Sequence, residues 1–178
     1  CPADLDQAGP SVVVCGNGRN ERYQAIAETF MDFAWETRHF DSNVYLSVDA
    51  TMARLKELGP SNGPIVIADC SDNPGSGAYG DSTFLLASML QSNLDNAAFA
   101  TIFDPKAASQ LQKERINARV TLEIGGKTDP KYGPPVRVTG RIVSHTDGSY
   151  LARGPRWGGT TQQLGPTAVL RVDGIDIV

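Results

Sequence analysis

The spacing of apolar and polar residues follows two different patterns along the chain, and the pattern changes after about Ala118. Before it, short β-branched runs are followed by apolar positions three and four residues apart, the spacing of an amphipathic helix. After it, apolar and polar positions alternate singly, as in strands with one buried face. The pattern predicts an α/β portion over residues 1–117 and a β-rich portion over residues 118–178. Because no linker separates them, we expect both to pack as one domain.

The first portion contains runs typical of buried strands and stretches typical of helices. The strands are expected at Ser11–Cys15, Pro64–Asp69 and Ala97–Phe103, and the helices at Tyr23–Ala34, Val48–Leu58, Leu85–Leu90 and Pro105–Lys113. Ser47 and Asp104 are typical N-caps, and Gly59-Pro60 is a typical helix end. Strands that alternate with helices favour parallel pairing through crossover helices.

The second portion shows no convincing helix. Strands are expected at Val120–Ile124, Val136–Val143, Thr167–Val172 and Ile175–Val178. The dipeptide Asp147-Gly148 is a turn signal, and two turn-rich loops cover residues 125–135 and 154–166.

Composition excludes several classes of protein. Hydrophobic residues make up 40% and charged residues 20% of the 178 residues, with 18 glycines and 11 prolines. This balance excludes a coiled coil, collagen and a disordered chain. The net charge of −4 leaves no basic surplus for phosphates, so nucleic acid is not expected as a partner. No apolar run is long enough to span a membrane.

The cysteines indicate neither a disulfide framework nor a structural zinc site. Cys1, Cys15 and Cys70 are far apart and odd in number. Together with the absence of a signal peptide, this favours a cytoplasmic location. The chain begins with Cys1 rather than Met, which favours an excised domain over a processed N-terminal cysteine nucleophile.

The densest polar feature is the glycine-rich stretch from Asp69 to Thr83, between a predicted strand and a predicted helix. In open α/β sheets this position often binds ligands, and glycines allow backbone amides to approach them. The stretch has no lysine and so is not a P-loop. The alternative is a tight connection in which Asp72 and Asp81 are caps. The candidate cleft residues here are Asp72, Asn73, Gly75, Gly77 and Asp81.

No complete catalytic or metal-binding set is visible in this chain. His39 and His145 are the two histidines, and they lack metal-ligand spacing. Asp69, Asp72 and Asp81 could hold a hard cation, although capping roles are favoured. The GxSxG nucleophile elbow is absent. We therefore assign no catalytic residue and no metal ligand.

Aromatic residues divide into two groups. Most fall on predicted core faces: Phe30, Phe33, Trp35, Phe84, Phe99 and Phe103. Trp157 instead lies in a glycine-rich loop, where it could contact a substrate or cover the edge of the β portion. It is the remaining cleft candidate.

Several short motifs occur in an order that resembles the C-terminal domain of microcystinase C (MlrC)-like metallopeptidases. They are Ile67-Ala68-Asp69, Asp72–Thr83, Asp104-Pro105, Gly125-Gly126-Lys127, Gly133–Val136, Asp147-Gly148 and Leu164–Ala168. An entry segment, Ala8–Val12, extends the resemblance over nearly the whole chain.

The resemblance implies a larger, zinc-dependent parent enzyme that hydrolyses amide bonds, microcystin peptides among the family's substrates. Its zinc ligands are expected in a preceding N-terminal catalytic domain, absent from this chain, so this chain itself is expected to bind no zinc. The glycine-rich loop would then line an interdomain cleft for a peptide or amide substrate. Two alternatives stay open: a stand-alone module for a small ligand, and a non-catalytic domain that braces the parent or forms its homodimer.

Overall fold

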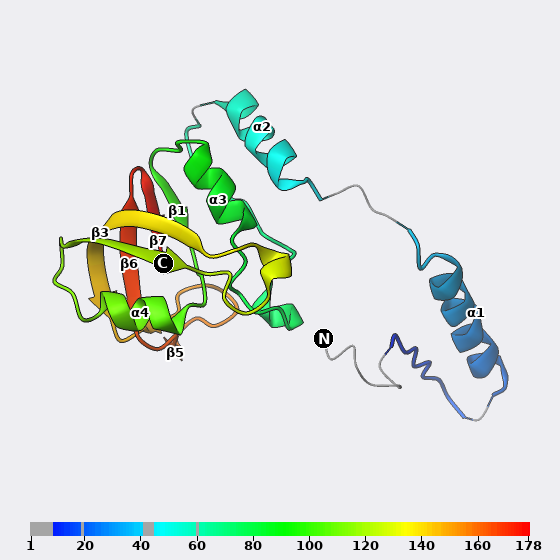
Figure 1. Ribbon diagram of the computed structural model, residues 1–178. Helices are drawn as coiled ribbons and strands as arrows, with labels where there is room; N and C mark the ends of the chain where they lie inside the picture. The colour runs from blue at the N-terminus through cyan, green and yellow to red at the C-terminus, as the bar shows by residue number, and fades with distance from the viewer. Residues whose placement is uncertain (1–8, 19, 41–44, 60) are drawn as a thin grey trace. The chain divides into compact units, whose positions relative to one another are not determined.

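The computed structural model describes residues 9–18, 20–40, 45–59 and 61–178 (Figure 1). The chain divides into two compact units, Cys1–Leu46 and Ser47–Val178. The question of a nucleophilic role for Cys1 lies outside the described residues. No helix within the described ranges has the length and apolar character needed to cross a bilayer.

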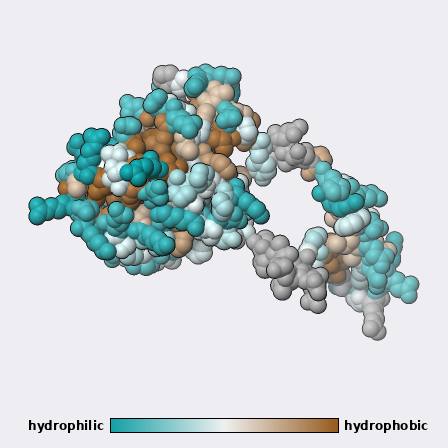
Figure 2. Space-filling model, in the orientation of Figure 1, coloured by the Kyte–Doolittle hydropathy of each residue, from teal (hydrophilic) through white to brown (hydrophobic). Residues whose placement is uncertain are grey.

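The first unit is built around helix α1 (Arg22–Glu36), close to the predicted span. Its start is fixed by Asn20, whose side-chain oxygen accepts a hydrogen bond from the Arg22 N–H at 2.9 Å. No residue of α1 is buried, and Phe33 and Trp35 are 64% and 68% exposed. Apolar surface is visible on this helix in Figure 2. The expectation that these aromatic residues lie in a core is therefore wrong for the described structure.

Two predicted buried strands, residues 11–15 and 64–69, are not strands in the structure. Val13 and Val66 are 83% and 85% exposed. A strand exists only when a neighbouring backbone takes its N–H and C=O groups, and neither run has a paired strand among the described residues. Both runs have the β-branched composition of a strand, but the part of the chain that the structure describes supplies no pairing partner for them.

Helices α2 and α4 of the second unit begin where the capping residues predicted, whereas α3 does not begin at a predicted cap. Helix α2 (Val48–Leu58) begins after Ser47, whose Oγ accepts the Ala50 N–H at 3.2 Å, and ends at Gly59. Helix α3 spans Phe84–Gln91. Helix α4 (Pro105–Leu111) begins after Asp104 and ends two residues before the expected Lys113. Two short 3₁₀ helices, η1 (Pro74–Ser76) and η2 (Pro130–Tyr132), lie in the loops.

The main sheet has five strands in the order β1-β7-β6-β3-β2. They are β1 (Ala97–Phe99), β2 (Arg119–Ile124), β3 (Val136–Thr146), β6 (Thr167–Val172) and β7 (Ile175–Ile177). A separate hairpin joins β4 (Ser149–Leu151) to β5 (Thr161–Gln163). Among the described strands β1 and β7 form the one parallel pair, and the other pairings are antiparallel.

This topology corrects the expected arrangement of the first portion. Successive parallel strands joined by crossover helices are not found in the described residues. Instead β1 pairs with β7, at the far end of the chain, through the register Ala97 to Ile175. The mixed α/β content is confirmed, and one sheet combines strands from both sides of residue 118.

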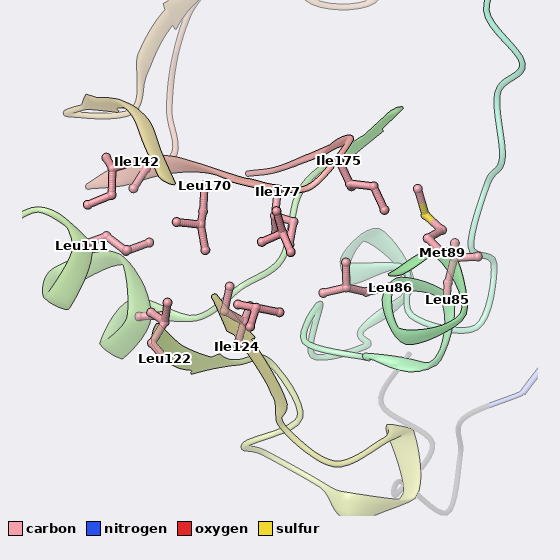
Figure 3. Packing of buried hydrophobic residues seen from close by; sticks show 14 of the residues in the cluster. Leu85, Leu86, Met89, Leu111, Leu122, Ile124, Ile142, Leu170, Ile175 and Ile177 are labelled. Carbon is pink, nitrogen blue, oxygen red and sulfur yellow. The ribbon is translucent and has the colours of Figure 1, made fainter. Parts of the chain in front are cut away.

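A single hydrophobic core lies between this sheet and the helices of the second unit. Figure 3 shows side chains from α3, α4 and four strands converging on one interior. Leu86 and Ile142 are fully buried, and Leu170 is 1% exposed. Complete burial of such side chains contributes roughly 1.5–3 kcal/mol each. The core therefore holds α3 and α4 in place, and with them the loops at the start of each helix.

Candidate functional site

The glycine-rich loop is ordered by its own polar groups. Asn73 has an extended backbone, as expected for a residue before proline, and its Oδ1 accepts the Gly75 N–H at 2.9 Å. Gly77 ends η1 with φ at +89°, a left-handed conformation that glycine adopts without strain. Asn73, Gly75 and Gly77 are all exposed. Three of the predicted cleft residues thus form one tight turn at the surface.

Asp72 closes the other end of the loop. Its two carboxylate oxygens accept the N–H groups of Gly80, at 2.8 Å, and Ser82, at 2.7 Å. The loop therefore returns on itself from residue 72 to residue 82. Asp72 closes this loop and does not cap α3, which begins at Phe84.

Asp81 has a different role from the predicted helix cap. The N-cap of α3 is Thr83, and no side chain caps that helix. The Asp81 side chain is 2% exposed, and its Oδ2 accepts the N–H groups of Lys127 and Thr128, both at 2.9 Å. Its backbone oxygen accepts the Gly126 N–H at 2.7 Å. Asp81 is a tether to a distant loop, which local sequence signals could not reveal.

Thr83 adds a second connection between the same regions. Its N–H donates to the Tyr132 oxygen at 3.1 Å, and its Oγ1 donates to the Pro134 oxygen at 2.8 Å. The rings of Tyr79 and Tyr132 meet edge to face with centroids 6.1 Å apart. The glycine-rich loop, residues 125–128 and residues 130–134 are therefore one connected assembly.

Asp104 and Lys127 connect this assembly to α4 and β2. One oxygen of Asp104 accepts the Ala107 N–H at the start of α4, and the other accepts the Gly125 N–H, both at 3.0 Å. The Lys127 Nζ pairs with the same second oxygen and donates to the Glu123 carbonyl at 2.9 Å. Burial raises the pKa of Asp104, but the hydrogen bonds from Lys127, Ala107 and Gly125 outweigh it and bring the pKa below its ordinary value. Asp104 was expected as a cap, but its ion pair with Lys127 was not.

A cavity of about 740 Å³ opens beside the glycine-rich loop. The glycine-rich loop lines the cavity through Pro74, Tyr79 and Gly80. Residues of α4 and of β6 also line it. The Phe103 N–H donates to the Gly80 oxygen, at 2.6 Å, and joins two of the walls. Phe103 is 65% exposed, so it borders this cavity and does not lie in the core as expected.

Trp157 lies in the segment between β4 and β5, apart from the residues that line this cavity. Its side chain is 55% exposed, and the Arg156 guanidinium carbon lies 5.3 Å from its ring centroid. Among the described residues, no hydrogen bond or aromatic ring contact joins Trp157 to the glycine-rich loop. Trp157 would therefore line a cleft only if another surface forms the rest of that cleft.

The described residues do not form a metal site. Within these ranges no three His, Cys, Asp or Glu side chains lie close enough to hold an ion. His145 lies in β3, where its Nε2 is buried without a hydrogen-bond partner, and His39 is exposed after the end of α1. Cys15 and Cys70 are free and exposed.

The fold resembles that of a crystal structure from Mesorhizobium sp. BNC1 described as “Putative metallopeptidase”. The two superpose with a TM-score of 0.74 at 20% sequence identity, over 87% of this chain and 31% of that chain. At this identity the likeness is one of fold.

Residues 67–178 match the family model described as the MlrC C-terminus. The chain belongs to this family, as the ordered motifs indicated. Microcystinase C from Sphingomonas sp is 29% identical over 173 residues, which cover 97% of this chain and 31% of that protein. The chain thus spans about a third of the length of either relative.

Proposed function

We propose that this chain is the C-terminal part of a zinc-dependent amide or peptide hydrolase and that its glycine-rich loop lines the substrate cleft. Family membership and the metallopeptidase description of a structural relative support the reaction class. Hydrogen bonds to Asn73 and Asp72 order the loop, and the loop lies beside the cavity. Both observations support its assignment to the substrate cleft. This rigid, exposed loop beside the cavity is the observation that carries the proposal.

The metal belongs, in this proposal, to a preceding catalytic domain of the parent. The relatives are about three times as long as this chain, since it covers 31% of each. The exposed β-branched runs at residues 11–15 and 64–69 are suited to pairing with a sheet that such a domain supplies. The role of this chain's own residues is to shape and order one side of the cleft.

The proposal is tested on the full-length protein. We expect purified parent protein to retain zinc, to hydrolyse linear peptides including linearised microcystin, and to lose activity when a chelator removes the metal. Asn73→Ala should lower turnover by at least about tenfold, the equivalent of roughly 1.4 kcal/mol of transition-state stabilisation.

Asn20→Ala is the matched control for that substitution. Asn20 makes the same contact, a side-chain oxygen that accepts the N–H two residues later at 2.9 Å, but at the start of α1. If both variants lower turnover per folded molecule equally, the loop has no special place in the cleft. A parent protein without hydrolase activity or bound metal would favour a ligand-binding or bracing role.

A further inference from the structure

The cavity beside the glycine-rich loop has a chemical character that the reaction class does not predict. Its floor consists of core side chains, among them Leu111, Ile124, Leu170 and Ile177. Around them lie exposed apolar residues: Tyr79 at 49%, Phe103 at 65% and Leu164 at 56% exposure. Its volume of about 740 Å³ lies within the range of small-molecule sites, about 300–1,000 Å³.

The described side chains that line the cavity offer a ligand no free charge. Asp104 is the charged residue in its lining, and both of its carboxylate oxygens are taken, one by the Ala107 N–H and one by Gly125 and Lys127. The hydroxyl of Thr167 donates to the Gly165 oxygen at 2.9 Å. A charged ligand group would lose hydration here without gaining an oppositely charged side chain, which is costly.

The walls are held in position before any ligand arrives. The Phe103 N–H binds the Gly80 oxygen, at 2.6 Å, and the Ile102 N–H binds the Val178 oxygen, at 2.9 Å. On the opposite side, the Gln112 Nε2 donates to the Thr146 and Thr167 oxygens, at 2.8 Å and 3.1 Å. A preformed cavity costs little ordering entropy on binding.

We propose that this cavity binds an uncharged, predominantly apolar group of a small molecule. The identity of this apolar group rests on the proposed function. If the chain lines the cleft of a hydrolase, the group that enters the cavity is a large apolar side chain of the substrate. The binding itself depends only on the residues of this chain.

The test uses two fluorescent probes with one ring skeleton, neutral N-phenyl-1-naphthylamine and its anionic sulfonate, 1-anilinonaphthalene-8-sulfonate. We expect this chain to bind the neutral probe at one saturable site and the sulfonate at least about tenfold more weakly, because no Lys, Arg or His among the described residues lines the cavity. Equal affinity for both probes would overturn the proposal.

Ala108→Phe places a ring into the cavity from α4 and should weaken binding of the neutral probe at least about tenfold. Ala87→Phe is the matched control, since Ala87 is also half-buried on a helix, α3, but does not line the cavity. Leu164→Gln alters an exposed lining residue and provides a second variant if Ala108→Phe does not fold. If Leu164→Gln and a folded Ala108→Phe both bind the neutral probe as the wild type does, the probe binds elsewhere, for example on α1. That result would overturn the assignment of the binding site to this cavity.

The parent protein separates this inference from the proposed function. Ala108→Phe in the parent should raise KM for peptides with a large apolar side chain and leave KM for glycine- or alanine-containing peptides unchanged. If the parent hydrolyses no peptide but this chain still binds the neutral probe, the proposed function fails and the apolar site stands. If peptides are hydrolysed without any effect of Ala108→Phe on KM, the side-chain assignment fails.

Discussion

The Oδ2 atom of Asp81 accepts the backbone N–H of Lys127 at 2.9 Å, a hydrogen bond between residues 46 positions apart. The next N–H, that of Thr128, points to the same oxygen at 2.9 Å. One buried carboxylate therefore fixes the turn after β2 against the end of the glycine-rich loop. The Asp81 side chain is 2% exposed, and its removal leaves these two N–H groups without their protein acceptor.

Asp81→Ala should lower the free energy of unfolding by about 2 kcal/mol, since it leaves two part-buried backbone donors without their acceptor. This is larger than the roughly 1 kcal/mol expected from the loss of a helix cap. Urea unfolding of the chain, followed by circular dichroism, measures the difference. Asp129→Ala is the control because Asp129 accepts one local N–H, that of Lys131. Equal losses in the two variants would contradict the tether.

Gly126→Ala should prevent stable folding of the same turn. Gly126 has φ at +60°, and an added Cβ would lie 2.5 Å from the Gly133 oxygen. Gly159 has φ at +83° with no atom within 4 Å of an added Cβ, so Gly159→Ala should cost only about 1–2 kcal/mol of backbone strain. Thermal melting of both variants tests this. A Gly126→Ala variant as stable as Gly159→Ala would show that the loops separate freely.

Local signals in the sequence predicted the helices of the second unit well. Ser47, Gly59 and Asp104 lie at helix ends as expected, because capping depends on residues a few positions apart. Strand pairing was less predictable. The partner of β1 lies near residue 175, and no local pattern identifies a partner so distant in the sequence. The run around Val66 has a strand's composition but no pairing partner among the described residues.

In the candidate site, too, the sequence predicted local contacts and did not predict contacts between distant residues. Asn73 and Gly77 could be predicted because their turn is local. The roles of Asp81, Thr83 and Lys127 depend on contacts across 23 to 51 positions, and a single sequence does not show which residues meet. The available signal was the family resemblance, whose motifs include Asp72–Thr83, Asp104-Pro105, Gly125-Gly126-Lys127 and Gly133–Val136.

Val66→Glu should leave the stability of this chain nearly unchanged, because the Val66 side chain is 85% exposed. In the full-length parent the same substitution should lower stability by about 2 kcal/mol or more, since the proposed pairing with the preceding domain would bury the new charge. Val66→Thr, which keeps the β-branched shape, should be tolerated better. Thermal melting of chain and parent provides the comparison, and equal small effects in both would show that residues 64–69 stay exposed in the parent.

The stability of the chain should fall in acid partly because Asp104 is protonated. Its pKa is below the ordinary value in the folded state, so its ionisation stabilises the folded chain fully above the pKa of the unfolded state, about 3.9. That contribution is lost as the pH falls through the lowered pKa. Asp104→Asn cannot ionise and should be less stable than the wild type by about 2 kcal/mol at neutral pH. This difference should shrink as the pH falls below about 3.9 and through the lowered pKa of Asp104.

Urea unfolding of both proteins across this pH range measures the difference directly. The pKa values of Asp147, lowered by hydrogen bonds from Ser149, and of Asp176, lowered by the hydrogen bond from Arg171, also contribute to acid sensitivity. Both residues are present in wild type and variant, and their contributions cancel in the difference. A difference that does not change as the pH falls from neutral to well below about 3.9 would mean that Asp104 acts through its shape and hydrogen bonds alone, and that its charge pairing with Lys127 adds nothing.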